Sequence, residues 1–343
     1  MIKRLVILGV ILLWGTACDL EHIDLPNRLV PETVDTDTEL PFLMINGTKL
    51  HLETFGEIDR PILIFLHGGP GSDYRAMISE DGVENVSRYP NQRQFASLGL
   101  SQLQNDYYCI FYDRRGAGLS PRFAAAEVTL QDQIDDLDAL VDYFLYLQDV
   151  NSQHVNLFGL SFGGYLATAY INQHPSKVHN VVLYEPRPFT EAAFDLLDLT
   201  SPFEQLGANW IDEQTSSGTH IIPDSHERMD YLRAIGASNN STPEFNESRS
   251  ITYWRLGAQV FLDIENEIRR NKPNIVNRLE NFAGNMLFLY GENTEAAPNI
   301  DAYLNEMTSH YPNSSTIEIP NAAHNGHWDN PVALSNAIRT FIQ

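Results

Sequence analysis

The sequence predicts an α/β protein with a doubly wound, mainly parallel sheet and an inserted helical cap. Short apolar runs, typical of strands that are covered on both faces, alternate with helical patterns along most of the chain. The alternation stops between residues 187 and 283, where helical patterns replace strands, and it then resumes. We therefore expect a core formed by residues 42–186 and 284–343 and a helical cap formed by residues 187–283.

The first eighteen residues, MIKRLVILGVILLWGTAC, have the form of a secretory signal. Lys3 and Arg4 precede an apolar stretch from Leu5 to Trp14, which is too short to span a bilayer as a stable helix. The ending GTAC is similar to a bacterial lipobox, whose cysteine becomes the lipidated first residue of the mature protein. We expect a lipoprotein-type signal peptide over residues 1–18, lipidation of Cys18 and a membrane-anchored place in the bacterial cell envelope, periplasmic or surface-exposed. Ordinary secretion and an uncleaved anchor are the alternatives.

Acidic residues dominate the next segment and the charge of the whole chain. Residues 19–41 are acidic, contain three prolines and show no helical or strand period, so we expect an acidic tether that leads away from the membrane. The chain has a formal net charge of −23, which argues against nucleic acid as a partner.

The elements of the expected core follow in order after this tether. FLMINGTKLHLETFG predicts a hairpin that turns at Asn46 and Gly47. Apolar runs then predict strands at residues 61–68, 107–113, 154–161, 179–185, 285–291 and 315–320. Helical patterns occupy residues 132–147 and 330–342 of the core and residues 253–268 of the cap.

A serine lies at the sharpest of these junctions, in VNLFGLSFGGYLATAY at residues 155–170. An apolar strand precedes GLSFG and a helix follows it, so this short segment must turn abruptly. A serine at the apex is forced into a strained backbone conformation, and the residues two before and two after it are crowded, which suits Gly159 and Gly163. The hydroxyl then points outward, as in a G-x-S-x-G nucleophile elbow. We predict that Ser161 is a nucleophile.

A glycine-rich loop, LHGGPG, ends the strand that starts at Pro61. Its glycines allow backbone N–H groups to approach a substrate oxygen closely. We predict an oxyanion hole made by the N–H of Gly69 and that of Phe162, the residue after the serine. His67 is expected to orient the loop, together with the neighbouring Gly68.

Two histidines compete for the role of general base in IPNAAHNGHWDNP, which follows the last predicted strand. A histidine on that loop can reach the serine at the strand end. We favour His324, which follows a pair of small residues, over His327.

A third stretch, DRRGAGLS, follows the strand YYCIFYD. In this order and at these separations, HGGPG, DRRGAGLS and GLSFGG resemble the proline iminopeptidase branch of the α/β-hydrolases. The middle motif of that branch usually reads D-Q-R-G-x-G-x-S, so Asp113, Arg115 and Gly116 match it and Arg114 departs from it. The resemblance implies a serine hydrolase with the chain order nucleophile, acid, base.

The resemblance covers the chain from about Phe42 to its end, although the cap matches only in position. In the aminopeptidases of this branch, acidic cap residues hold the free amino terminus of the substrate. The acidic residues available here are Glu204, Asp212, Glu213, Glu227 and Glu265. The sequence does not select among them, and relatives with these motifs also include esterases, lactonases and amide hydrolases.

The acid of the expected triad departs from the family pattern. Members of the superfamily usually carry an aspartate after the strand NMLFLYG, where this chain has Thr294, which cannot carry a negative charge. Glu185 ends the earlier strand HNVVLYE, and some relatives place their acid at that strand end. An ionisable group that finishes an apolar strand beside a cleft is more easily explained by function than by packing. We favour Glu185 over Glu295, with Glu292 third.

These observations predict a serine hydrolase that cleaves an ester or amide bond of a small molecule or short peptide through an acyl-enzyme. An aminopeptidase that releases N-terminal proline or a similar residue is one form, and a carboxylesterase or lactonase is the other. No metal or organic cofactor is expected, because HExxH and paired ligand spacings do not occur. A tethered binding protein without catalysis is the rival, but it would need a damaged site, and Ser161, His324 and the glycine loop are all present.

Overall fold

The computed structural model describes residues 30–78, 99–148, 153–197, 225–238, 255–294 and 299–342. In this part of the chain, eight strands form one sheet with the order β1-β2-β4-β3-β5-β6-β7-β8. The strands are β1 (Phe42–Ile45), β2 (Thr48–Phe55), β3 (Ile62–Leu66), β4 (Tyr108–Tyr112), β5 (Val155–Leu160), β6 (Val178–Tyr184), β7 (Asn285–Gly291) and β8 (Ser314–Ile319). The first two strands pair antiparallel with their neighbours, and all later pairs are parallel. The predicted doubly wound α/β fold is confirmed.

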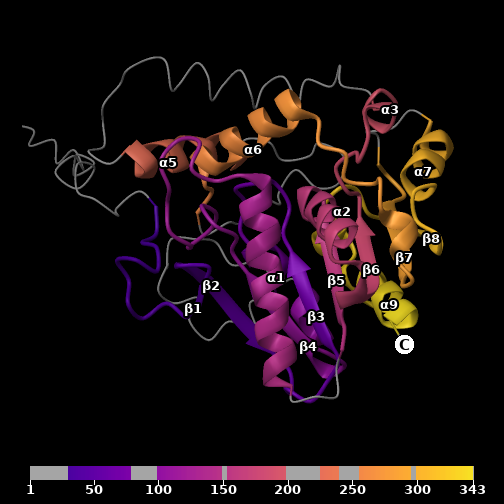
Figure 1. Cartoon of the computed structure of the whole chain (residues 1–343), viewed down its shortest axis with the longest axis horizontal. Coiled ribbons are helices and arrows are strands. Elements are labelled where there is room, and N and C mark those ends of the chain that lie inside the picture. The colour runs from indigo at the N-terminus through magenta and orange to yellow at the C-terminus, as the bar shows by residue number, and fades with distance from the viewer. Residues whose placement is uncertain are drawn as a thin grey trace, which may run out of the picture.

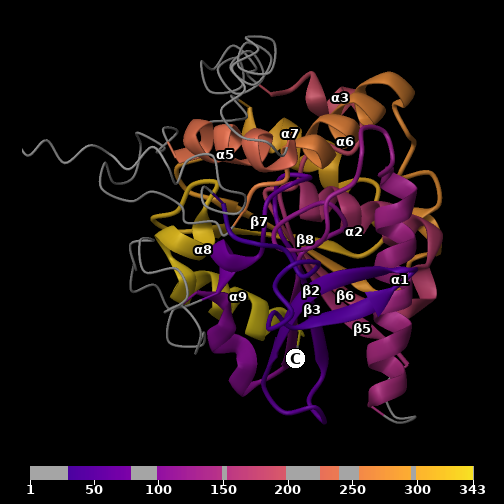
Figure 2. The ribbon, with the colours of Figure 1, turned by 90° about the vertical axis from the view of Figure 1, so that its left-hand side faces the viewer.

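Helices cover both faces of this sheet, and Figure 2 shows α1 and α2 on one side and α8 and α9 on the other. The longer helices are α1 (Leu130–Leu147), α2 (Phe162–Gln173), α5 (Ser225–Ser238), α6 (Ala258–Asn271), α7 (Ile300–Thr308) and α9 (Pro331–Ile342). The short ones are α3 (Glu191–Phe194) and α8 (Gly326–Asp329), with 3-10 turns η2 (Arg75–Met77), η5 (Leu100–Asn105), η6 (Pro175–Lys177) and η7 (Leu279–Asn281). Alternate residues of each central strand enter opposite apolar clusters, as in a sheet that is buried on both faces.

Local sequence signals explain where several elements begin. Asn46 and Gly47 have φ angles of 46° and 78°, so the β1–β2 hairpin turns as the Asn-Gly pair predicts. The first core helix begins two residues before the expected range, because Thr129 and Asp132 form a capping box. The cap helix α6 begins at Ala258, later than expected, because the preceding residues 255–257 run over the loops at the sheet end.

Three asparagines form a polar ladder across the central strands of the sheet, in which Asn156 and Asn180 are buried and Asn285 is exposed. The Nδ2 group of Asn156 on β5 donates to the carbonyl of Ile62 at 3.1 Å. Asn180 on β6 donates to Asn156 at 3.0 Å, and Asn285 at the start of β7 donates to Asn180 at 3.2 Å. The two asparagine pairs, Asn156 with Asn180 and Asn180 with Asn285, are also directly opposite in the register of the parallel strands. The ladder lies at the amino ends of the strands, opposite the end that carries Ser161.

Two cap helices, α5 and α6, lie across one end of the sheet (Figure 1). The N–H of Gly257 donates to the carbonyl of Gly71, after β3, at 2.7 Å, and an added Cβ on Gly116, after β4, would lie 2.8 Å from Val260 Cβ. This end is therefore the carboxyl end of the parallel strands. Within the cap, the fully buried Asp230 of α5 accepts from the N–H of Ala258, the first residue of α6, at 2.9 Å.

The described part of the expected tether, residues 30–41, packs on the core instead of running free. Val30, Val34 and Leu40 are buried, and the N–H of Val34 donates to the carbonyl of Leu119 at 2.9 Å. Burial of these three apolar side chains stabilises the segment in spite of its acidic composition. Residues 1–29, with Cys18 and the expected signal peptide, lie outside the described residues. In the ranges that are described, no helix is both long and apolar enough to cross a membrane.

Candidate active site

Ser161 occupies a sharp turn between β5 and α2 at the carboxyl end of the sheet. Its φ and ψ angles are 53° and −118°, and a positive φ is uncommon for a residue other than glycine. The helix begins at the next residue, Phe162, within the segment GLSFG that the sequence places before it. The N–H of Ser161 donates to the carbonyl of Tyr184, at the end of β6, at 3.0 Å. The turn is therefore tied to the neighbouring strand end.

The glycines around Ser161 are required by close packing of backbone on backbone. A Cβ added to Gly159 would lie 2.6 Å from Gly164 Cα, and one added to Gly163 would lie 2.0 Å from the carbonyl oxygen of Leu66. A Cβ added to Gly164 would lie 2.5 Å from Pro186 Cβ. Side chains at these positions would push the serine turn away from the ends of β3 and β6.

The loop after β3 lies beside the serine. A Cβ added to Gly68 would lie 3.4 Å from Ser161 Cβ, in ordinary van der Waals contact. Gly69 has a φ of 43°. The N–H groups of Gly69 and Phe162 have no hydrogen-bond acceptor among the described residues. Both groups are therefore available to donate to a substrate oxygen. His67 is buried beneath this loop.

His324 and Glu185 meet at the same end of the sheet. The Nδ1 atom of His324 lies 2.8 Å from Oε2 of Glu185. When Nδ1–H donates to the carboxylate, the neutral ring carries its lone pair on Nε2, which is the state that a general base needs. The side chain of His324 is 49% exposed and that of Glu185 is 7% exposed, so the histidine faces outward and the carboxylate lies behind it.

The loop that carries His324 is held on both sides. The hydroxyl of Tyr184, the last residue of β6, donates to the carbonyl of Ala323 at 2.5 Å. The N–H of Ala323 donates to Oδ2 of Asp329 at 2.9 Å. The end of β6 therefore binds the serine turn, the histidine loop and the histidine ring through two consecutive residues, Tyr184 and Glu185.

Three donors converge on the carboxylate of Glu185. Besides His324, the N–H of Gly291 donates to Oε1 at 2.9 Å, and the hydroxyl of Thr294 donates to the same oxygen. Thr294 occupies the place where the family pattern expects an aspartate, and its hydroxyl binds the carboxylate of Glu185. Glu185 also has a φ of 40°, a conformation that these contacts must hold in place.

The acidic partner sets the pKa of His324. Burial alone would lower it, but the hydrogen bond and the negative charge of Glu185 outweigh burial and raise the pKa above its ordinary value. Burial is the largest single influence, but the hydrogen bond and the charge of Glu185, with a smaller contribution from the charge of Asp329, together exceed it. Glu185 therefore stabilises the protonated form of the ring.

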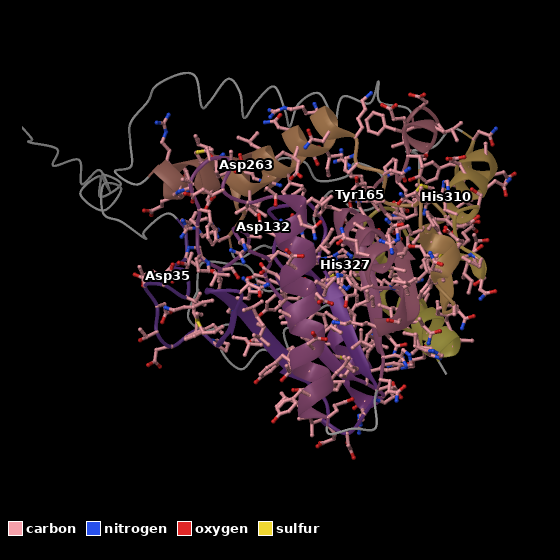
Figure 3. All side chains as sticks on the ribbon, viewed as in Figure 1. Asp35, Asp132, Tyr165, Asp263, His310 and His327 are labelled. Carbon is pink, nitrogen blue, oxygen red and sulfur yellow. The ribbon has the colours of Figure 1, made fainter. Side chains whose placement is uncertain are left out.

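The second histidine of this loop has a different environment. His327 is 1% exposed, and neither of its ring nitrogens has a hydrogen-bond partner among the described residues. Burial, followed by the nearby His324, lowers the pKa of His327 to about 3. Figure 3 labels His327 near the middle of the view, and its side chain is buried. His327 is thus a neutral packing residue.

The other residues singled out by the motifs lie around this centre. Asp113 is fully buried, and its carboxylate accepts from the N–H groups of Tyr74 at 3.1 Å and Leu119 at 2.8 Å. Arg115 points away to α1, where its guanidinium binds Asp136 at 2.8 and 2.7 Å. Asp113 supports the loops of the site, whereas Arg115 is held on α1.

Of the two alternative acids, the structure describes Glu292, which has no hydrogen bond with the histidine. The carboxylate of Glu292 accepts from the N–H of Asn321 at 2.8 Å, so it braces the histidine loop from outside. Glu295 lies outside the described residues, as do Glu204, Asp212 and Glu213 of the cap.

A family model described as the alpha/beta hydrolase fold matches residues 61–331 of this chain. The chain belongs to the α/β-hydrolase fold family. Its solved structural neighbours include the enol-lactonase from Burkholderia xenovorans, with a TM-score of 0.57, 17% sequence identity and coverage of 88% of this chain and 99% of that one.

Curated relatives of this α/β-hydrolase carry several activities. A cis-3-alkyl-4-alkyloxetan-2-one decarboxylase from Shewanella oneidensis is 28% identical over 192 residues, which are 54% of this chain and 49% of that protein. A proline iminopeptidase from Pestalotiopsis fici is 30% identical over 152 residues, 43% of this chain and 44% of that protein. The chain thus matches about half, or less, of the length of these relatives. The findings support a hydrolase that resembles the proline iminopeptidase branch.

Sequence reasoning did not find three residues of this α/β-hydrolase site. Tyr184 was part of an apolar strand, and nothing in a strand pattern shows that its hydroxyl holds a distant loop. Thr294 stood out only as a missing aspartate. Arg114 stood out as a departure from the family motif, and that departure was the signal for its unusual surroundings, described below.

Proposed function

We propose that this α/β-hydrolase is a serine hydrolase that cleaves an ester or amide bond through an acyl-enzyme on Ser161. One observation carries the proposal: Glu185 holds Nδ1 of His324 at 2.8 Å at the strand end next to the serine turn. The Ser161 hydroxyl makes no hydrogen bond with the described residues. Without substrate, catalytic hydrogen bonds are often long and shorten only in the complex.

In the proposed reaction, Nε2 of His324 takes the proton of Ser161 as its oxygen attacks the substrate carbonyl. The N–H groups of Gly69 and Phe162 donate to the oxygen of the tetrahedral intermediate, and Glu185 stabilises the imidazolium that forms. His324 returns the proton to the leaving alcohol or amine. Water, activated by the same histidine, then hydrolyses the acyl-enzyme.

Two substrate classes fit this chemistry. The relatives named proline iminopeptidases support release of an N-terminal proline or a similar residue. A specific contact favours small acyl esters or lactones instead. Glu265, on α6 above the site, forms an ion pair with Arg187, which follows the Glu185 turn, and Glu227 on α5 is buried. A carboxylate that is neutralised by an arginine binds a substrate ammonium weakly.

A substrate panel tests the proposal and separates the two classes. Aminoacyl arylamides, including the prolyl one, are compared with short acyl esters and lactones, on wild type and on Ser161→Ala. Serine-dependent turnover of either group supports the serine hydrolase. Arylamide turnover above ester turnover selects the aminopeptidase, and the reverse selects the esterase. Absence of Ser161-dependent turnover on the whole panel would favour the binding protein.

The pKa of His324 predicts the pH dependence of the reaction. The base must be neutral, so kcat/KM should fall as the pH drops through the pKa of His324, which lies above the ordinary value of about 6.5. Glu185→Gln removes the negative charge that raises this pKa, so the acid limb of its profile should move to lower pH. We expect this shift in the residual activity, measured as kcat/KM from pH 5 to 9. A limb that stays in place would contradict the assigned pair.

We also propose that the protein is lipid-anchored in the cell envelope through Cys18. Mass spectrometry of the natural amino terminus should find a mature chain that starts at acylated Cys18. Cys18→Ser should give a soluble, active protein or an unprocessed precursor, because the proposed catalytic residues do not include the lipidated cysteine. A mature chain with any other first residue would contradict the anchor.

A further inference from the structure

Arg114 is a buried cation with unusual partners. It lies two residues after β4 and is 1% exposed. Its Nη1 donates to the carbonyl of His67 at 2.7 Å, and its Nη2 donates to the carbonyls of Gly69 at 2.6 Å and Gly68 at 3.2 Å. No carboxylate among the described residues lies within ion-pair distance of the guanidinium, and its Nε has no partner there.

Burying such a cation costs free energy, because the charge loses its hydration. A charge removed from water normally pairs with an opposite charge. The neighbouring Asp113 does not pair with Arg114, because its carboxylate binds His51 at 2.9 Å and two backbone N–H groups. Burial lowers the pKa of Arg114 to about 10, so the side chain stays protonated at neutral pH. Burial and then the charge of Arg114 lower the pKa of His67 well below its usual value, so His67 adds no second charge.

The three carbonyls fix the direction of the loop's N–H groups. In a trans peptide, the C=O of one residue and the N–H of the next point in opposite directions. Because the carbonyl of Gly68 points at Arg114, the N–H of Gly69 points away from it. Gly68 is also the loop residue that lies against Ser161. Arg114 therefore turns the N–H of Gly69 away from the interior and holds it there.

The same guanidinium contacts the second donor residue. Its central carbon lies 5.0 Å from the ring centre of Phe162, whose N–H is the other proposed oxyanion donor. We propose that Arg114 is a positioning residue of the oxyanion hole, which orients the N–H of Gly69 and places a fixed positive charge behind both donors. This inference rests on the proposed serine hydrolase. The usual glutamine of the family motif would supply two N–H donors and no charge.

A tetrahedral inhibitor measures this role directly. With phenylboronic acid, the oxygen of Ser161 bonds to boron and its proton passes to His324, so the tetrahedral boron carries a negative charge beside the oxyanion hole. In Arg114→Gln we expect kcat to fall about 10- to 100-fold and the inhibition constant of the boronic acid to rise by a similar factor, with KM within about threefold. Arg114→Lys, which keeps the charge and loses the fork of donors, should lie between Arg114→Gln and wild type.

The neighbouring arginine supplies a matched control. Arg115→Gln breaks a buried ion pair with Asp136, so it should lower the melting temperature and leave kcat and boronate inhibition near wild-type values. Arg114→Gln that keeps kcat and boronate inhibition within about threefold of wild type would overturn the inference. If that variant does not fold, Arg114→Lys decides by the same two measurements. If the wild type shows neither Ser161-dependent turnover nor boronate binding, the proposed function itself is contradicted. Arg114 would then have no oxyanion hole to position.

Discussion

Replacing Ser161 with alanine is expected to lower kcat by about 10⁶, because the nucleophile and its base act as one unit. His324→Ala should cause a loss of similar size, since a serine hydroxyl without a base is a poor nucleophile. The two effects should not add in the double variant. The measurement is hydrolysis of the best substrate of the panel, with folding of each variant checked by its melting temperature.

His327 provides the control for this result. It lies three residues after His324 on the same loop, but it is buried and its pKa is lowered to about 3. His327→Leu puts an apolar side chain of similar volume in the same buried place and should retain most of the activity. His327→Ala should lose some stability, because it leaves a cavity. A larger loss of activity in either His327 variant than in His324→Ala would show that the base is assigned to the wrong histidine.

Glu185→Gln is expected to lower kcat by about 10⁴, because an amide keeps the shape of the acid but cannot stabilise the imidazolium. The proposed acid has an unusual place in the fold, directly after the end of β6. Thr294, near the end of β7, donates to it from the place that an aspartate usually holds. Adding Thr294→Asp to Glu185→Gln should therefore restore activity at least tenfold above Glu185→Gln alone, because the new carboxylate lies beside the lost one.

Two other glutamates separate this assignment from its alternatives. Glu292→Gln changes a carboxylate of the same loop that binds the backbone of Asn321 and should leave kcat near the wild-type value. Glu295→Gln is expected to do the same. A large loss confined to Glu295→Gln, with Glu185→Gln active, would transfer the acid to Glu295.

The sequence predicted the sheet well because its strands are apolar runs with few competing signals. The same pattern singled out Glu185, because a carboxylate at the end of a buried apolar strand is rare unless it is paired. In the structure it is hydrogen-bonded to His324. The packing of residues 30–41 could not be predicted, because three apolar side chains are a weak signal in an acidic, proline-containing segment. The partners of Arg114 could not be predicted either. They are backbone carbonyls, which carry no residue identity, on a loop 45 to 47 positions away.

The asparagine ladder at the amino ends of the strands fixes the register of the strands that precede Ser161 and Glu185. Ser161 follows Asn156 by five positions, and Glu185 follows Asn180 by five. A slip of β6 by two residues along β5 would keep every side chain on its own face of the sheet. It would also carry Glu185 about 7 Å along the strand, out of reach of His324. The ladder resists such a slip, because the displaced amide of Asn180 would be buried without a partner. The amide contacts at the amino ends of β5 and β6 thus help to set the distance between Ser161 and Glu185 at the carboxyl ends.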